Sequence, residues 1–519
     1  PTQISANNLH ILTPASHIQM NLSFSHSGFN AYNSFIDSVK MTGDFRETSL
    51  NLNDISYFAP EIKGMDNEIK IAGLVKGTVA SLKSKNLQLA LGKQTIFKGN
   101  VNMDGLPDIT ETFIHLKVKK FKTDYYDLAN FKLPGYKNLE IPEAAKNAGI
   151  IGVTGYFTGF INDFVSSADF KTGLGTLKTD LSLKTISKNN IAYDGHLSLI
   201  DWDLGKTFPE SGKLGLVDFS SSINGIIIDY KDINLYLKAN VSKIELLGNE
   251  FNGITIDGKL ENRKFNGNLN LNDDLIKLDF LGLVDFSDSL PRFNFKSKVT
   301  NAYLHRLNLW ERDSTSCLSS TMDFDFKGSN IDNLTGTLRF DSTTYIEKNK
   351  KYELKELLLS TNKSANENKT LQLKSDFLDA VINGKYTFLG FYSSLNNIIN
   401  TYLPSVQFAD KAERHVEIEQ LFDYEINIKN ITPLTELFLP QFKLLTNANL
   451  FGSYNSTTST ILLNGEASQF RYEGLLISDW YIRGQNTGRS MSINTGAQSI
   501  LLKEPTADDP AKLGIENFS

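Results

Sequence analysis

The chain has 519 residues, with 53 Lys or Arg and 59 Asp or Glu, so its formal net charge at pH 7 is −6. Its length exceeds the ~250–300 residues at which a single compact core usually stops growing, which predicts several domains or a repeat array. Aromatic residues make up 11% of the chain, which is too many for a disordered protein. The sequence contains no cluster of Lys and Arg of the kind that binds the phosphate backbone of a nucleic acid. The composition therefore argues against disorder and against a nucleic-acid partner.

A single cysteine, Cys317, limits the covalent chemistry of the chain. No intrachain disulfide and no multi-cysteine metal site can form, and we expect Cys317 to be a small buried side chain. The sequence contains no run of 18 or more apolar residues, and it opens at Pro1 without a charged-then-apolar leader. We expect any membrane anchor or targeting segment to lie outside this sequence.

Apolar and polar residues alternate along most of the chain, as they do in half-buried antiparallel strands. Turn signals rich in Gly, Asn and Asp separate the alternating runs at intervals of about 8–12 residues, for example at Asn102–Gly105, Asn272–Asp274 and Asn383–Gly384. This pattern predicts a meander of short strands. The alternating positions that we expect to form its apolar face are Leu87, Leu89, Leu116, Leu235, Leu237, Leu269, Leu271, Phe293, Phe295, Phe324 and Phe326.

Two further patterns suggest internal repetition and close strand crossing. The six residues Gly215–Ser220 recur, letter for letter, at Gly282–Ser287, which favours a repeat architecture. Glycines four residues apart occur at Gly73 and Gly77 and again at Gly155 and Gly159. Because neither pair lies in an apolar segment of membrane length, we expect bulges or close strand approach there.

Helical patterns are few. Pro142 and the following Glu-Ala-Ala-Lys predict a short helix that stops at Gly149. Helical spacing of apolar residues at 391–445, with a second start at Thr432–Pro433, predicts a helical insertion. We expect this insertion to cover an opening of the β array or to dock a partner.

The predicted organisation has three parts. A continuous β repeat array occupies 1–390, the helical insertion occupies 391–445, and the β array continues over 446–519.

The sequence offers no motif for catalysis or for cofactor binding. The seven histidines show no H-x-H or H-x-x-x-H pair, and His10, His17 and His26 are unevenly spaced on polar strands, which favours solvated side chains. No G-x-S-x-G elbow, P-loop or G-x-G-x-x-G turn is present. We therefore expect a protein that is not an enzyme, with no metal and no cofactor.

A sheet of roughly 30–40 strands at ~4.8 Å spacing would carry one apolar face along its whole length. Leaving that face in water would cost about 25 cal/mol per Å² of apolar surface, so something must cover it. The sheet can fold over into a sandwich, or it can curl into a half-open trough filled by lipid chains or by a partner. Periodicity alone slightly favours the sandwich.

Several phrases resemble TamB-type translocation and assembly module proteins of the AsmA-like superfamily. The similarity runs from about Leu50 to Gly474 and concerns structural phrases rather than catalytic motifs. The segments that carry it are Asp54–Gly64, Gly99–Pro107, Gly155–Phe164, Phe265–Asn270 and Leu371–Ala380.

This resemblance implies a mainly β protein whose long antiparallel sheet curls into a half-open trough, a β-taco, with an apolar interior and a few short helices. It implies a place in the periplasm of a Gram-negative bacterium, an inner-membrane anchor, and an outer-membrane β-barrel partner, TamA-like, at a carboxy end that this sequence lacks. The leading hypothesis is that the interior binds phospholipid acyl chains and carries phospholipid between the two membranes. The alternatives are an assembly or secretion factor that holds outer-membrane β-strands by edge pairing, and a passive periplasmic spacer.

Overall fold

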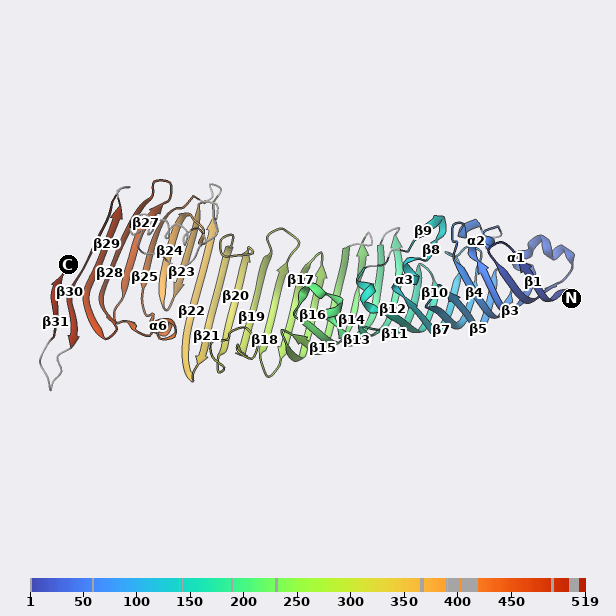
Figure 1. Ribbon diagram of the computed structural model, residues 1–519, viewed down its shortest axis with the longest axis horizontal. Helices are drawn as coiled ribbons and strands as arrows, with labels where there is room; N and C mark the ends of the chain where they lie inside the picture. Colours follow the sequence, from blue (N-terminus) through green and yellow to red (C-terminus); the bar gives the residue numbers. More distant parts are fainter. Residues whose placement is uncertain are drawn as a thin grey trace. The chain divides into compact units, whose positions relative to one another are not determined.

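A computed structural model describes residues 2–57, 60–139, 141, 143–187, 190–228, 232–364, 368–388, 390, 402, 419–486, 490–503 and 513–519. Twenty-nine strands in this part of the chain belong to one antiparallel sheet that does not close, and two short strands form a second sheet (Figure 1). The mainly β prediction is confirmed. The chain divides into two compact units, Pro1–Asn262 with Leu271–Asp273, and Arg263–Asn270 with Asp274–Ser519.

In the first unit each strand of the large sheet pairs with the next one along the chain, except that β7 pairs with β10 because the small sheet of β8 and β9 lies between them in sequence. The strands are β1 (Thr2–Leu12), β2 (His17–His26), β3 (Lys40–Asn51), β4 (Glu68–Gly77), β5 (Ser81–Leu91), β6 (Thr95–Asp104), β7 (Phe113–Asp124), β8 (Lys132–Leu133), β9 (Lys137–Asn138), β10 (Ile150–Phe160), β11 (Asp163–Thr172), β12 (Gly175–Ser187), β13 (Asn190–Asp203), β14 (Leu214–Ile228), β15 (Asp232–Leu246) and β16 (Asn249–Glu261).

In the second unit the same order continues from β18 to β25, and β28 then pairs with both β26 and β27. The boundary between the units passes through β17. The strands are β17 (Lys264–Asn272), β18 (Lys277–Asp285), β19 (Arg292–Tyr303), β20 (Cys317–Lys327), β21 (Thr335–Glu347), β22 (Lys350–Lys363), β23 (Lys369–Ser375), β24 (Leu378–Lys385), β25 (Leu421–Ile428), β26 (Phe442–Leu444), β27 (Ala448–Asn455), β28 (Thr460–Tyr472), β29 (Leu475–Asn486), β30 (Met491–Lys503) and β31 (Leu513–Phe518).

The helices are short and lie in the connections between strands. The predicted helix after Pro142 is present as the 3-10 helix η4, and Gly149 follows it with a φ of +60°. The described helices are η1 (Phe29–Ser34), α1 (Phe35–Ser38), α2 (Leu52–Ile55), η2 (Pro60–Ile62), α3 (Tyr125–Ala129), η3 (Pro134–Tyr136), η4 (Glu143–Ala148), α4 (Leu204–Thr207), η5 (Pro209–Ser211) and α6 (Thr432–Phe438).

Strand register separates each unit's sheet into an apolar face and a polar face, because side chains alternate along every strand. In the first unit one row of cross-strand neighbours runs from Leu116 through Phe157, Ser166, Leu181, Gly195 and Ile223 to Leu237. The row beside it, on the opposite face, runs from Lys117 through Tyr156, Ser167, Asp180, His196 and Ser222 to Lys238.

The second unit shows the same division. A row of cross-strand neighbours runs from Phe295 through Phe324, Leu338, Leu359, Leu373, Ala380, Ile426, Leu450 and Gly465 to Ile482. On the other face Lys296, Asp323 and Arg339 are consecutive neighbours, and Lys296 Nζ lies 3.2 Å from a carboxylate oxygen of Asp323. We call the two surfaces the apolar face and the polar face.

Bulges interrupt the strands at residues with positive φ. Asn8, Asn86, Asp201 and Asn301 each lie where the register shifts, with φ values between 50° and 58°. A polar side chain on the neighbouring strand accepts a hydrogen bond from the freed backbone N–H in all four cases, at 2.6 to 3.0 Å. Because a bulge bends its strand and raises the local twist, we expect the strands to bend at these four positions.

Glycines mark places where strands approach closely. A Cβ added at Gly155 would lie 2.2 Å from the carbonyl oxygen of Ser167, and one at Gly159 would lie 2.4 Å from that of Asp163. The predicted close strand approach is therefore confirmed at this pair. Asn383–Gly384, expected to be a turn, instead lies inside β24, where a Cβ at Gly384 would be 2.1 Å from the carbonyl oxygen of Leu421.

Two predictions about organisation are corrected. The stretch 391–445 is not a single helical insertion, since it contains β25, which pairs with β24 and β27 and continues the sheet. Residues 391–401 and 403–418 lie outside the described residues. The two copies of the repeated hexapeptide are not equivalent either, because Gly215–Ser220 lies in the first half of β14 whereas Gly282 begins the last four residues of β18.

Candidate functional site

Where cross-strand pairing connects the residues that were predicted to line an apolar surface, they lie on the apolar face. Leu87 connects through Gly99 to Val118, two residues from Leu116, and Leu116 shares a row with Leu237. Phe293 pairs with Phe326, and Phe295 pairs with Phe324. Leu89 follows the exposed Gln88 in β5, and Leu235 and Leu237 flank the exposed Tyr236 in β15. Leu269 and Leu271 alternate with exposed asparagines in β17.

Ten of these eleven side chains are only half-buried. Leu271 is buried at 9% exposure, whereas the other ten predicted residues all retain intermediate exposure. A side chain in the core of a sandwich is normally covered on every side by the opposing sheet. The described part of the chain therefore leaves this face partly open.

A ladder of phenylalanine rings strengthens the apolar face of the second unit. Phe280 and Phe295 have ring centroids 4.9 Å apart, and Phe324 lies 5.2 Å from Phe295 and 5.1 Å from Phe340. Phe293 stacks on Phe326 at 4.7 Å. Sequence reasoning missed Phe280 and Phe340, although Leu278 and Phe280 show the same alternation as the residues that it selected.

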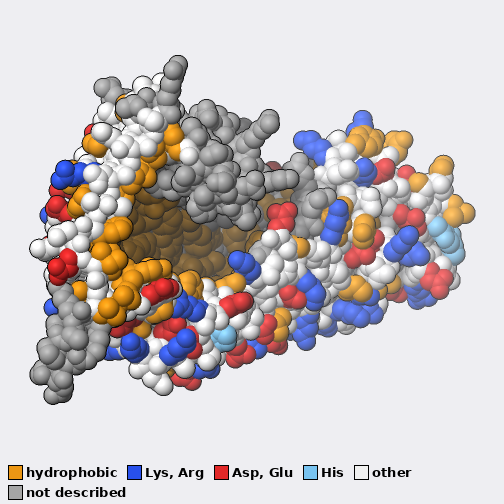
Figure 2. Space-filling model, turned by 60° about the vertical axis from the view of Figure 1, so that its left-hand side comes forward, with side chains coloured by type: hydrophobic (Ala, Val, Ile, Leu, Met, Phe, Trp, Pro, Cys, Tyr) orange, Lys and Arg blue, Asp and Glu red, His pale blue; other side chains and the backbone are white. Residues whose placement is uncertain are grey.

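Figure 2 shows hydrophobic side chains gathered in a hollow of the second unit, on the side that comes forward in that view. The surface outside the hollow carries Lys, Arg, Asp and Glu side chains. This distribution agrees with the division into faces that strand register gives.

An aromatic cluster occupies the apolar face between β23 and β27. Leu371, Tyr386, Phe422 and Tyr454 are buried there, and Tyr402 packs against them. The hydroxyl of Tyr402 accepts a hydrogen bond from Asn486 Nδ2 of β29, 2.8 Å away. Tyr402 thus lies on the apolar face, whereas the neighbouring residues of the predicted insertion, 391–401 and 403–418, lie outside the described residues.

Buried polar groups beside this cluster are hydrogen-bonded. Gln420 is fully buried, its Oε1 accepts from the backbone N–H of Thr387 and its Nε2 donates to the Thr387 hydroxyl. Burial, together with the negative charge of Asp332, raises the pKa of Tyr386 to about 12. The phenol therefore stays neutral, as an apolar surface requires.

The histidines and the cysteine have distinct surroundings. The rings of His10 and His17 lie 6.2 Å apart. His26 is buried at 3% exposure against Phe29 and Tyr32, and its Nε2 has no hydrogen-bond partner among the described residues, so the expectation that it is solvated was wrong. Cys317 is buried as predicted, and burial raises the pKa of its thiol. Within the described ranges no three His, Cys, Asp or Glu side chains are placed to hold a metal ion.

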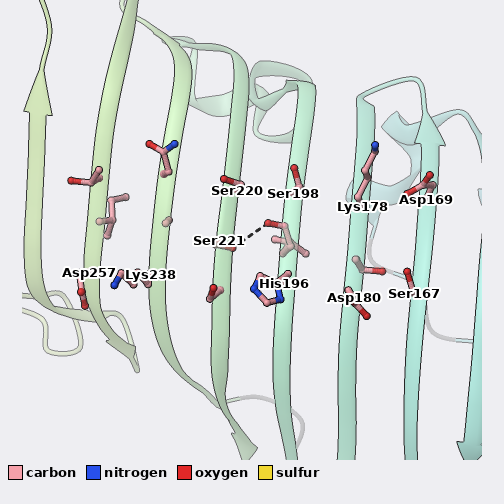
Figure 3. A pocket seen from close by; sticks show the side chains of 17 residues that line it. Ser167, Asp169, Lys178, Asp180, His196, Ser198, Ser220, Ser221, Lys238 and Asp257 are labelled. Atoms are coloured by element: carbon pink, nitrogen blue, oxygen red, sulfur yellow. Dashed lines mark hydrogen bonds between the residues drawn. The ribbon is translucent and has the colours of Figure 1, made fainter.

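A shallow hollow of about 710 Å³, lined by polar and apolar residues, lies on the first unit across β11–β16 (Figure 3). Three consecutive residues on each of the five strands β12–β16 line it, so the hollow runs across these strands. Ser221 donates a hydrogen bond to the carbonyl oxygen of Leu197 across its centre, at 3.4 Å.

Asp180, His196 and Ser222 are consecutive cross-strand neighbours at this hollow. They have the residue types of a hydrolytic triad, but no hydrogen bond joins their side chains in the described part of the chain. Serine in such a triad is activated by a hydrogen bond to the histidine, which the carboxylate in turn orients. Asp180, His196 and Ser222 therefore have the residue types of a catalytic triad but not its hydrogen-bonded arrangement in the described structure.

No helix among the described residues is long and apolar enough to cross a membrane. Comparison of the chain with models of protein families, with curated proteins and with solved structures found no match. The class of protein that can be defined is therefore structural: an open antiparallel β array with one apolar and one polar face.

Proposed function

We propose that this protein carries phospholipid along its apolar face, which lines a half-open trough. The half-buried state of the predicted lining residues carries the proposal. Each methylene of an acyl chain that leaves water for such a surface contributes about 0.8 kcal/mol. An acyl chain would cover the exposed part of the apolar face. Its binding would need no specific polar contact along the length of the acyl chain.

The bulges and the faces support the trough. Bulges bend strands and raise their twist, so repeated bulges favour a curled sheet over a flat one. The hollow in Figure 2, with hydrophobic side chains gathered in it, agrees with this interpretation for the second unit. The polar face would then meet water.

We further propose the setting that the TamB-type resemblance implies. The protein would lie in the periplasm of a Gram-negative bacterium, be anchored in the inner membrane, and meet a TamA-like outer-membrane barrel. It would support the biogenesis of the outer membrane by supplying phospholipid, without enzymatic chemistry of its own.

The test is lipid content by native mass spectrometry and lipid extraction, on protein purified from a Gram-negative host without detergent. Leu235→Asp combined with Leu237→Asp places two carboxylates on the apolar face of β15 and should remove most of the bound phospholipid. Lys238→Asp combined with Asn240→Asp places two carboxylates on the polar face of the same strand and should leave the bound lipid in place. Circular dichroism checks that both variants keep the fold.

A lipid-free wild-type protein would contradict the proposal. Binding of peptides that correspond to outer-membrane β-strands, measured on the same protein, would then favour the assembly factor. Absence of both ligands would favour the passive spacer. Global unfolding of the Leu235/Leu237 variant alone would indicate a closed core.

A further inference from the structure

The sheet of the second unit has a notch in one edge. β23 and β24 contain 7 and 8 residues, whereas β22 contains 14. The register of β22 with β23 begins at Leu357, so residues 350–356 extend beyond β23. On the far side β28 continues past Ala467, the last position paired with β27, as far as Tyr472. The notch therefore spans the ends of β23, β24, β25 and β27, and at ~4.8 Å per strand this is roughly 20 Å.

Helix α6 lies beside this notch (Figure 1), and strand β26 follows it in the chain. β26 pairs with Phe470–Tyr472, the extension of β28. α6 reaches the other side, where Glu436 forms an ion pair with Lys350 at 2.8 Å. Arg312, from the connection between β19 and β20, donates to the carbonyl oxygen of Leu437 and lies over the ring of Phe438, 5.0 Å from its centroid.

The contacts that hold α6 against the β21–β22 side of the notch are weak. Thr435 is its single buried residue, Thr432, Pro433, Leu434 and Leu437 are half-buried, and Phe438 is 61% exposed. The Lys350–Glu436 pair is exposed, and such pairs stabilise little. A helix of 7 residues is also not stable by itself in water.

Arg312, by contrast, is fixed to the sheet. Its Nε lies 2.9 Å from Oε1 of Glu347, a carboxylate at 4% exposure, and Glu347 also accepts a hydrogen bond from Tyr345 at 2.9 Å. The anchor would stay in place if α6 moved away. The side chain of Arg312, which contacts α6, is therefore held in position independently of the helix.

We propose that α6 is a movable closure over a lateral opening in the wall of the second unit, through which an acyl chain enters or leaves the apolar face. This inference rests on the proposed function, because an opening needs a cargo. Its structural part, the local release of α6, is independent of any ligand.

Hydrogen–deuterium exchange tests that release. α6 should exchange faster than β22 and β28, which border it, and Lys350→Ala with Phe438→Ala should speed the exchange further without changing the two strands. The pair leaves Arg312 and Glu347 intact, so no buried charge loses its partner. Protection of α6 equal to that of β22 and β28 would overturn the inference.

Cross-linking tests the path of the cargo. In a Cys317→Ala background, Lys350→Cys and Glu436→Cys joined by a short bismaleimide should slow the release of a fluorescent phospholipid to acceptor vesicles, while the amount bound at equilibrium stays the same. The matched control joins Lys296→Cys and Asp323→Cys, a cross-strand ion pair on the polar face, and should not affect release. Equal release rates in the two cross-linked proteins would overturn the lateral opening while lipid binding persists. Failure of the wild-type protein to bind the probe would overturn the proposed function and the opening together.

Discussion

At the residue scale, aspartates in the connections hold neighbouring turns. Asp127 of α3 accepts hydrogen bonds from the backbone N–H groups of Lys93, Gln94 and Thr95 and from the Thr95 hydroxyl, at 2.6 to 3.1 Å. Partial burial raises the pKa of Asp127, but these donors outweigh it and hold the pKa below its usual value. The carboxylate thus fixes the β5–β6 turn to the connection after β7.

The same arrangement recurs twice. Asp54 in α2 accepts from the hydroxyls of Ser16 and Thr13 in the β1–β2 turn, and its pKa is lowered by those two bonds. Asp313 accepts from the hydroxyl of Thr315 and from the backbone N–H of Lys348 in the β21–β22 turn, with the same effect on its pKa. Three connections that differ in sequence are therefore each held by an aspartate that accepts hydrogen bonds from a neighbouring turn.

The first prediction concerns Asp127. Asp127→Asn should destabilise the first unit by about 1–2 kcal/mol at pH 7, because an amide has one acceptor oxygen where the carboxylate has two and carries no charge. Thermal unfolding measures the loss. Asp169→Asn is the control, since Asp169 is exposed and its side chain forms no hydrogen bond within the part of the chain that the structure describes; it should change the melting temperature little.

The second prediction is the pH dependence of the same group. An unfolded Asp has a pKa of about 3.9, and the folded pKa of Asp127 is lower, so its stabilisation is present above about pH 4 and is lost as pH falls through the folded value. The difference in melting temperature between wild type and Asp127→Asn should therefore shrink from pH 7 to pH 3. A constant difference would show that charge is not the cause.

At the element scale, the bulges set the curvature of the strands. Asn301 has a φ of 53°, and its backbone N–H donates to the Ser319 hydroxyl at 2.9 Å. Asparagine and glycine tolerate this conformation, whereas a β-branched side chain does not.

The third prediction uses that difference. Asn301→Val should destabilise the second unit by roughly 1–2 kcal/mol, and Asn301→Gly should cost distinctly less, because only valine opposes the positive φ. Urea unfolding of the two variants measures the contrast. Equal losses would indicate that the asparagine side chain, and not the backbone conformation, matters at this position.

At the scale of the whole molecule, strands contact mainly their immediate neighbours, so stability should be local. Phe324 is central to the phenylalanine ladder, with ring centroids 5.2 Å from Phe295 and 5.1 Å from Phe340. Because each strand is stabilised mainly by its immediate neighbours, the fold does not require the apolar face to be fully covered.

The fourth prediction tests this locality. Phe324→Ala should speed hydrogen–deuterium exchange in β18–β22 and leave β4–β7 unchanged, because a lost contact in a linear array weakens only adjacent strands. Uniform acceleration across both units would contradict a linear array and would indicate one cooperative core.

The sequence alone determined the strand period, the separation of apolar from polar residues, the burial of Cys317 and the short helix before Gly149. These properties are local, since alternation, turn residues and helix signals act within a few neighbours along the chain. The apolar-face residues from Leu87 to Phe326 could be chosen on that basis.

Only the tertiary structure decided the rest. Bulge positions, the order of rings in the phenylalanine ladder, the burial of His26 and the contact of Arg312 with α6 depend on which strands pair and in which register. Arg312 and Leu437 are separated by 125 positions in sequence, and no local pattern relates them. Such contacts arise because a short β23 and β24 leave a notch in the edge and a distant helix lies beside it, a consequence of pairing that residue order alone does not express.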